Sequence, residues 1–144
     1  MKSFQVQKTI KASPTTIWAL MTDAPHIPEW DPGIDHIEGR IAPGEKVKVV
    51  TKASPDRTFP VTVTEFEPGR RMVWSGGMPL GLFKGVRTYT LAPAGDGTTA
   101  FSMQEVYSGL LAPLFTRSIP DLSGAFEAYG AGLKQRAETT TAAG

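Results

Sequence analysis

The stretch that decides the fold is APLFTRSIPDLSGAFEAYGAGLKQRA, residues 112–137. Large apolar side chains recur in it at steps of three and four residues, the spacing that places side chains on one face of an α-helix. These side chains are Phe115, Ile119, Leu122, Phe126, Tyr129 and Leu133. One apolar stripe needs one partner surface. The sequence therefore predicts a long C-terminal helix packed against the structure that the rest of the chain forms.

Glycines interrupt this helix at Gly124, Gly130 and Gly132. A glycine in a helix interior costs about 1 kcal/mol relative to alanine, so three of them indicate either close approach of another backbone or unfilled space. Pro120 removes one helical hydrogen bond, and we expect a kink there or a restart with Ser118 as N-cap. We interpret the helix as one wall of an apolar cavity.

Most of the chain before this helix alternates apolar and polar residues, the pattern of half-buried β-strands. The predicted strands are 4–10, 34–39, 45–52, 59–66, 70–75, 83–91 and 98–107. Ser13 followed by Pro14 predicts a helix over 14–21, and a second short helical turn follows around 23–27. The expected fold class is α+β: a curved antiparallel sheet of about seven strands, two short helices after the first strand, and the long C-terminal helix packed across the sheet over a cavity.

The chain of 144 residues fits one domain, expected over 1–138, with 139–144 as a disordered tail. Without cysteine it has no disulfide, thiolate metal site or thiol nucleophile. Fifteen basic and 14 acidic residues give a net charge of +1 and no footprint for nucleic acid. The apolar runs are too short to span a bilayer. We therefore expect a cytoplasmic monomer or homodimer whose partner is a small hydrophobic molecule.

The two long strands before the helix carry an arginine and a glutamate on their predicted inner face. Pairing Leu91 with Thr99 across the turn puts Arg87 and Glu105 on a diagonal. Burying either charge alone would cost several kcal/mol, so each needs the other or a polar ligand group. Two interpretations stay open: a structural ion pair near the cavity mouth, or an arginine that orients a carbonyl, carboxylate or phenolate of a ligand.

Aromatic, methionine and polar side chains of the predicted inner surfaces are the candidates for ligand contact, although any core has a similar composition. The candidates are Trp30, Phe59, Met72, Trp74, Phe83, Arg87, Tyr89, Phe101, Met103, Glu105, Tyr107, Leu122, Phe126 and Tyr129. The glycine-rich segment 76–83 exposes large apolar residues in what is expected to be a loop. Its Met78, Leu80 and Leu82 are the candidate gate.

No nucleophile motif or phosphate-binding loop occurs in the sequence. Acid–base chemistry remains open, with Arg87, Glu105, Tyr89 and Tyr107 as the candidate catalytic residues. Acidic and histidine residues around Trp30 match no metal-ligand spacing, and we interpret them as solvated turn residues, with no metal or cofactor expected. They are His26, Glu29, Asp31, Asp35 and His36.

Several short motifs, taken in order, resemble the polyketide cyclase/dehydrase and lipid transport superfamily, a START-related (SRPBCC) group that shares the birch-pollen-allergen fold. The motifs are Ala12-Ser13-Pro14, Ile17-Trp18, Thr22-Asp23, Trp30-Asp31-Pro32, the run from Thr64 to Arg71 with Trp74, and the run from Glu105 to Leu111. The resemblance covers about 4–137 and implies a helix-grip fold. It also implies binding of lipids, sterols, polyketides or hormones, with a minority of cyclases, aromatases and hydrolases. Pro120 departs from the unbroken helix of such proteins.

Three functional hypotheses follow. The first is binding of a small hydrophobic ligand such as a lipid, polyketide or aromatic compound in the cavity, for transport or sequestration. The second is a cyclase, aromatase, dehydrase or hydrolase that acts on such a ligand in the same cavity. The third is a protein-interaction module that docks through the exposed apolar side chains of 76–83.

Overall fold

The computed structural model describes residues 2–115 and 121–143, the side chains of residues 78, 79, 115 and 141–143 excepted. The strands are β1 (Lys2–Ile10), β2 (Ile34–Glu38), β3 (Lys46–Thr51), β4 (Ser54–Glu67), β5 (Arg71–Met78), β6 (Phe83–Pro93) and β7 (Thr99–Ser108). The helical elements are α1 (Pro14–Met21), η1 (Ala24–Glu29), η2 (Pro79–Gly81), α2 (Ala112–Phe115) and α3 (Ser123–Ala143). The predicted α+β class, antiparallel sheet and long C-terminal helix are confirmed.

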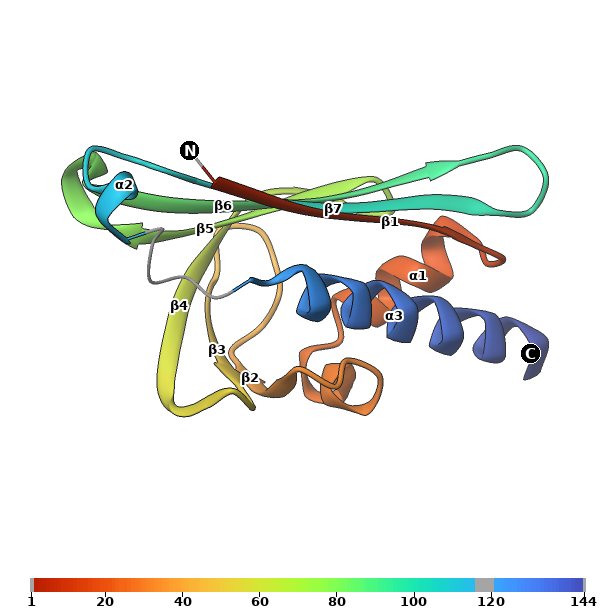
Figure 1. Cartoon of the computed structure of the whole chain (residues 1–144). Helices are drawn as coiled ribbons and strands as arrows, with labels where there is room; N and C mark the ends of the chain where they lie inside the picture. The colour runs from red at the N-terminus through yellow and green to blue at the C-terminus, as the bar shows by residue number, and fades with distance from the viewer. Residues whose placement is uncertain (1, 116–120, 144) are drawn as a thin grey trace.

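The strands form one seven-stranded antiparallel sheet in the order β1-β7-β6-β5-β4-β3-β2. Each strand from β2 to β6 pairs with the next one along the chain, and the N-terminal β1 joins the sheet beside β7. In Figure 1, β1, β7, β6 and β5 make an extended layer, while β4, β3 and β2 curl away from it on the side where α3 lies. The curl gives the sheet an inner face that α3 and α1 cover.

The hairpin between β6 and β7 departs from the predicted register. Leu91 pairs with Phe101 and not with the predicted Thr99, so the prediction was wrong by two residues. The two strands pair as far as Pro93 and Thr99, so the connection is 94–98, where the Asp96 side chain accepts a hydrogen bond from the backbone N–H of Thr98 at 3.1 Å. A shift by two residues keeps every side chain on its own face, so the predicted inner face is nevertheless right.

α3 covers the inner face at the β1 edge of the sheet, where its backbone lies closest to β1 and α1. Its buried side chains Phe126, Tyr129, Leu133 and Ala137 follow the predicted helical spacing. The helix begins at Ser123, and its first turn is preceded by Asp121, whose carboxylate accepts a hydrogen bond from the Ser123 N–H at 2.9 Å. The restart predicted at Ser118, and Pro120, lie outside the described residues. α3 continues through 139–143, where composition favoured disorder.

Two of the three glycines in α3 stand where another part of the chain approaches closely. A Cβ on Gly132 would lie 1.9 Å from the carbonyl oxygen of Trp30, and one on Gly130 would lie 3.2 Å from the Val6 side chain. A Cβ on Gly124 would meet nothing within 4 Å. Close approach of β1 side chains therefore explains Gly130, and close approach of the Trp30 backbone explains Gly132, which lets the turn after η1 dock on the helix.

The predicted helix after the first strand is confirmed. Ser13 accepts a hydrogen bond from the Thr16 N–H at 3.1 Å, which makes it the N-cap of α1, and the helix buries Ile17, Trp18 and Met21. η1 follows directly and leads into the turn at Trp30. Polar contacts also bind α3 to the N-terminal strand, since Lys134 donates to the Thr9 carbonyl at 2.6 Å.

The segment predicted as a loop over 76–83 is largely a hairpin. β5 extends through Met78 and pairs with β6 as far as the pair Met78 and Phe83. At the tip Leu80 has a backbone φ of 62° and a side chain that is 94% exposed. The carbonyl of Leu82 accepts a hydrogen bond at 2.7 Å from the N–H of Leu111, which ties the tip to the turn before α2. Among the described residues, no helix is both long and apolar enough to cross a membrane.

The close contact at Gly132 yields a testable prediction. Gly132→Ala should destabilise the protein by about 1–3 kcal/mol, because the new methyl group collides with the Trp30 backbone. Gly124→Ala is the matched control in the same helix; it should leave the stability unchanged or raise it by up to about 1 kcal/mol. Urea denaturation of both variants measures the difference. Equal stabilities for the two would contradict the packing described here.

Candidate functional site

Aromatic and methionine side chains fill the inner face of the sheet beneath α3. The buried members on β5, β6 and β7 are Met72, Trp74, Tyr89, Phe101 and Met103, and Leu91 is buried on the same face. They touch one another and the helix through ring contacts: Phe101 stacks on Tyr129 at 5.9 Å between centroids, and Trp74 packs against Tyr89 at 5.3 Å. The interior is therefore mostly apolar, and every polar group in it needs an explanation.

Arg87 and Glu105 lie directly opposite each other on β6 and β7 and form a two-pronged ion pair. Arg87 donates from Nε to Glu105 Oε1 at 3.1 Å and from Nη2 to Glu105 Oε2 at 3.4 Å. Their side chains are 27% and 14% exposed, so the pair is largely withdrawn from water without being sealed off. The guanidinium also lies over the ring of Phe126 at 4.9 Å, a cation–π contact with α3.

Tyr107 extends this pair toward the outside. Its hydroxyl donates a hydrogen bond to Glu105 Oε2, and its ring stacks on Phe83 at 5.8 Å. Gly85 is the residue paired with Tyr107, and a Cβ there would lie 3.2 Å from the phenol ring, so glycine leaves room for it. Tyr107, Phe83 and Glu105 are all partly exposed and form the accessible end of the interior.

The electrostatics of this cluster keep the arginine charged and the phenols neutral. Burial by itself would lower the pKa of Arg87, but Tyr89 and Glu105 beside the guanidinium raise it above its ordinary value. Burial raises the pKa of Tyr107, and the charge of Glu105 raises it further. Burial raises the pKa of Tyr89 as well. The phenols of Tyr89 and Tyr107 are therefore protonated at neutral pH, and the guanidinium of Arg87 can donate to an acceptor oxygen.

The deep end of the interior holds Trp30, Tyr89 and Tyr129. The Trp30 ring meets Tyr129 edge-on at 5.0 Å, and Tyr129 lies 5.9 Å from Tyr89. Burial raises the pKa of Tyr129 well above its usual range, and the pKa of Tyr89 is also raised. The indole Nε1 of Trp30 is buried, and among the described residues it has no hydrogen-bond partner.

Asp31 also belongs to this interior, which corrects its interpretation as a solvated turn residue. The residue is 5% exposed, and its Oδ1 accepts a hydrogen bond from the Gly33 N–H at 3.1 Å. Burial raises the pKa of Asp31, although Gly33 and the charge of Arg87 oppose the shift. The Asp-Pro-Gly spacing already indicated the turn. Its burial depends on the contact between Trp30 and α3, which no local pattern reveals.

The remaining predicted site residues lie at different depths. Leu122 is partly buried beside the core, whereas Phe59 is 40% exposed on β4 and stands apart from the cluster. Of the predicted gate, Leu80 points to solvent and Leu82 is partly buried, while the side chain of Met78 lies outside the described residues. The structure thus brings Arg87 and Glu105 together and leaves Phe59 aside.

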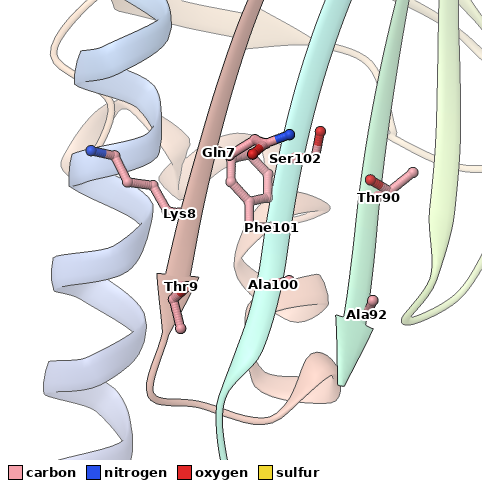
Figure 2. A pocket seen from close by; sticks show the side chains of 8 residues that line it. All are labelled: Gln7, Lys8, Thr9, Thr90, Ala92, Ala100, Phe101 and Ser102. Atoms are coloured by element: carbon pink, nitrogen blue, oxygen red, sulfur yellow. The ribbon is translucent and has the colours of Figure 1, made fainter. Parts of the chain in front are cut away.

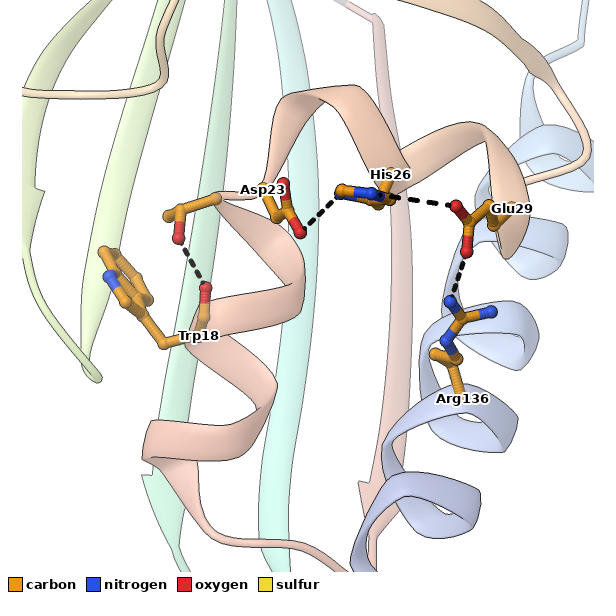
Figure 3. A network of polar contacts seen from close by, with 6 residues as sticks. Trp18, Asp23, His26, Glu29 and Arg136 are labelled. Carbon is orange, nitrogen blue, oxygen red and sulfur yellow. Dashed lines mark hydrogen bonds and ion pairs between the residues drawn. The ribbon is translucent and has the colours of Figure 1, made fainter.

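The histidines noted in the sequence lie in surface networks. His26 contacts Asp23 at 2.8 Å and approaches Glu29, which pairs with Arg136 of α3, as Figure 3 shows. Asp23 raises the pKa of His26 through a hydrogen bond. In the part of the chain that the structure describes, no group of three or more histidine and acidic side chains is arranged to hold a metal ion. These contacts fasten η1 to α3 at the surface.

Two surface depressions formed by described residues lie elsewhere. One, of about 450 Å³, lies over β1, β7 and β6 and is lined by Gln7, Lys8, Thr9, Thr90, Ala92, Ala100, Phe101 and Ser102 (Figure 2). Most of these side chains alternate with the core residues of the same strands, so they face away from α3. The other, of about 360 Å³, lies between η1 and the segment 39–41. The charged residues that line the second, Asp23 and Arg40, do not belong to the cluster of the interior.

The Arg87–Glu105 pair should be energetically coupled. Glu105→Gln leaves the arginine without its counter-charge and should cost about 1–3 kcal/mol of stability, whereas the double variant with Arg87→Met should cost less than the sum of the single changes. The exposed pair of Glu29 and Arg136 is the control, and its coupling should stay below about 1 kcal/mol. A double-mutant cycle in urea measures both. Equal coupling energies would contradict a largely desolvated pair.

Asp31 should make stability depend on pH. Because the pKa of Asp31 is raised in the folded state, its ionisation opposes folding. Asp31→Asn should therefore stabilise the protein at pH 7, and the gain should vanish as the pH falls below about 4, where the carboxyl is protonated in both states. The exposed Asp56→Asn should show no such dependence. Thermal unfolding from pH 3 to pH 8 checks this, and a pH-independent loss of stability in Asp31→Asn would refute it.

Comparison with known proteins places this chain in a family. The family described as polyketide cyclase / dehydrase and lipid transport matches residues 1–138. A search of curated proteins finds no match.

Three solved structures illustrate the likeness in fold. Protein MLL2253 from Mesorhizobium loti is 20% identical, with a TM-score of 0.75 over 96% of this chain and 98% of that chain. A START superfamily protein from Mycobacterium smegmatis is 15% identical, with a TM-score of 0.70 over 96% and 98%. A norcoclaurine synthase point mutant from Thalictrum flavum, in complex with a transition-state analogue, is 15% identical, with a TM-score of 0.73 over 97% and 96%.

The family match over residues 1–138 and the curled sheet that grips a C-terminal helix agree with each other and with the motifs of the sequence. The chain belongs to the polyketide cyclase/dehydrase and lipid transport family, with a START-like helix-grip fold.

Proposed function

We propose that the protein binds a small, largely apolar molecule between the sheet and α3, with Arg87 and Tyr107 holding its polar end. The observation that carries the proposal is a partly exposed ion pair inside an otherwise aromatic interior. Ligand sites are typically apolar and contain a few placed polar groups that fix orientation. The family description, which includes lipid transport, agrees with such a role.

Arg87 keeps donors for a ligand. A guanidinium has five N–H groups, and Glu105 receives hydrogen bonds from two of its nitrogens. With 27% of its side chain exposed, Arg87 can be reached from solvent. The alternative of a purely structural ion pair predicts that removing Arg87 changes stability and leaves ligand preference unchanged.

The ligand would enter at the partly exposed end of the interior. The rings of Tyr89, Phe101 and Tyr129 already contact their neighbours at the deep end, so added volume there requires these side chains to move. The end bounded by Phe83 and Tyr107 is less buried. We expect an apolar ligand to lie along Phe126 and Leu122 with its polar end at Arg87.

Catalysis in the same site is the second candidate function. Glu105 and the phenol of Tyr107 already share a hydrogen bond, and Arg87 is placed to stabilise an enolate oxygen while a tyrosine supplies the proton. Norcoclaurine synthase has a similar fold and is an enzyme, so the fold is compatible with a cyclase- or dehydrase-type reaction. The proposed catalysis rests on the site residues Arg87, Glu105 and Tyr107, because a fold alone does not imply a reaction.

The third candidate, a protein-interaction module, is supported by the exposed Leu80, Leu110 and Leu114 near the tip of the β5–β6 hairpin and α2. A cytoplasmic location is our proposal, and the absence of cysteine agrees with it. A monomer or homodimer is the oligomeric state that we expect.

A pair of neutral probes tests the binding proposal. The wild-type protein should bind 2-naphthylmethanol about tenfold more tightly than 2-methylnaphthalene, because the hydroxyl gains a hydrogen bond to Arg87 worth about 1–1.5 kcal/mol. Arg87→Met should remove this preference, and Lys84→Met, an exposed change on the same strand, should keep it. Tryptophan fluorescence titrations measure the affinities.

Each outcome separates one interpretation from another. A preference that survives in a folded Arg87→Met protein would assign the ion pair a structural role only. If neither naphthalene binds the wild-type protein, the interior does not take aromatic ligands of this size.

A further inference from the structure

Among the described residues, three of the four exposed large apolar side chains gather at one end of the sheet. Leu80, Leu110 and Leu114 are 94%, 80% and 64% exposed, and they belong to the tip of the β5–β6 hairpin, the turn after β7 and α2. Figure 1 shows α2 beside the β5–β6 connection at this end, far from the C-terminus of α3. We call these three side chains the leucine tip. Single apolar residues are normal on a surface, whereas a group of them needs an explanation.

Backbone hydrogen bonds hold the two loops of this end together. The carbonyl oxygens of Gly81 and Leu82 accept hydrogen bonds from the N–H groups of Leu110 and Leu111 at 3.2 and 2.7 Å. Gly109 lets the loops meet, because its φ is 117° and a Cβ there would lie 2.8 Å from the Leu82 carbonyl oxygen. The leucines therefore project from one joined surface and not from two independent loops.

Leucine is an unfavourable residue at position 80 in water. Its φ of 62° lies in the left-handed region, and Leu80 is the only described residue other than glycine with a positive φ. Glycine and asparagine adopt this conformation more readily than leucine does. Because the side chain is 94% exposed, it gains almost nothing from packing within the chain. Transfer of this side chain from water into an apolar phase would offset both costs.

The charges around the leucine tip are positive. Neither 76–90 nor 106–115 contains an aspartate or a glutamate. Lys84 is exposed near the start of β6 and pairs with Ser108, while Lys2 of β1 pairs with the neighbouring Tyr107. Lysines beside exposed leucines match a surface in which acidic headgroups cover an apolar layer.

We propose that the leucine tip docks on the surface of an anionic lipid bilayer, with its leucines between the acyl chains and Lys84 at the headgroups. A protein partner fits this surface less well. Three leucines offer on the order of a few hundred Å² of apolar surface, whereas a stable protein complex buries about 800 Å² on each partner. A bilayer needs no matching shape, and a small apolar insertion beside lysines is enough for reversible attachment.

The leucine tip adjoins the end of the interior at which we expect a ligand to enter. Phe83 follows Leu82 directly and stacks on Tyr107 at 5.8 Å between centroids. An apolar molecule can therefore pass between the bilayer and the interior without crossing water. Docking goes beyond the proposed function and does not depend on it, because the leucine tip lies outside the interior.

Flotation of the purified protein with lipid vesicles tests the docking. The wild type should float with phosphatidylcholine vesicles that contain about 30% phosphatidylglycerol, and less with phosphatidylcholine alone. The triple variant Leu80→Asn, Leu110→Ser, Leu114→Ser should lower the partition coefficient at least about tenfold. Phe59→Ser removes the fourth exposed apolar side chain, on β4, and as the matched control should float like the wild type.

Two further measurements separate docking from folding. Leu80→Asn alone should weaken flotation without lowering the melting temperature, because asparagine accepts the left-handed conformation. Since the chain has no cysteine, a single introduced cysteine can carry an environment-sensitive fluorophore. The label on Leu80→Cys should shift its emission to the blue when vesicles are added, and the label on Phe59→Cys should not.

The outcomes decide between the possible occupants of this surface. A wild type that does not float, or a triple variant that floats equally well, would overturn the inference. A wild type that fails to float but self-associates, in a way that the triple variant abolishes, would assign the leucine tip to a protein contact. Because no ligand is added, flotation without binding of the naphthalenes would keep the docking and refute the proposed function, and the reverse result would refute the docking alone.

Discussion

The contact between the Trp30 carbonyl and Gly132 is the constraint on which the interior depends. No side chain fits between them, because a Cβ on Gly132 would lie 1.9 Å from the oxygen. The turn after η1 is thereby held against α3, which seats the Trp30 ring on Tyr129 and buries Asp31. A helix that stood farther from the turn would leave both side chains in water. The glycine thus couples the N-terminal insert to the C-terminal helix.

The interior accepts charged groups because they are arranged as a connected series. Tyr107 donates to Glu105, Glu105 accepts from Arg87, and Arg87 contacts the face of Phe126. Each of these contacts gives a charged or polar group a partner, which lowers the free-energy cost of removing the charges from water. Asp31 stands apart from this series: its Oδ1 accepts a hydrogen bond from the Gly33 N–H, and no ion pair joins it to another described residue.

Local patterns predicted most of the architecture. Alternation located the strands and assigned Arg87 and Glu105 to the inner face, and helical spacing identified Phe126, Tyr129 and Leu133 as the buried stripe. Local patterns did not predict the features that depend on contacts between distant segments. The β6–β7 register differs from the prediction by two residues, because the Pro-Ala-Gly-Asp-Gly turn is compatible with either pairing and the turn signals alone did not distinguish them.

The burial of Asp31 likewise followed from packing against a helix about a hundred residues away. The exposed position of Phe59 depends on the curl of the sheet, which strand patterns do not specify.

The most direct test of ligand binding between the sheet and α3 is native mass spectrometry of the protein purified from the cells that make it, followed by extraction of any bound molecule. We expect a mass above the bare 15.5 kDa chain and release of one apolar molecule with a polar end. The bare mass in every preparation, with nothing extracted, would contradict it.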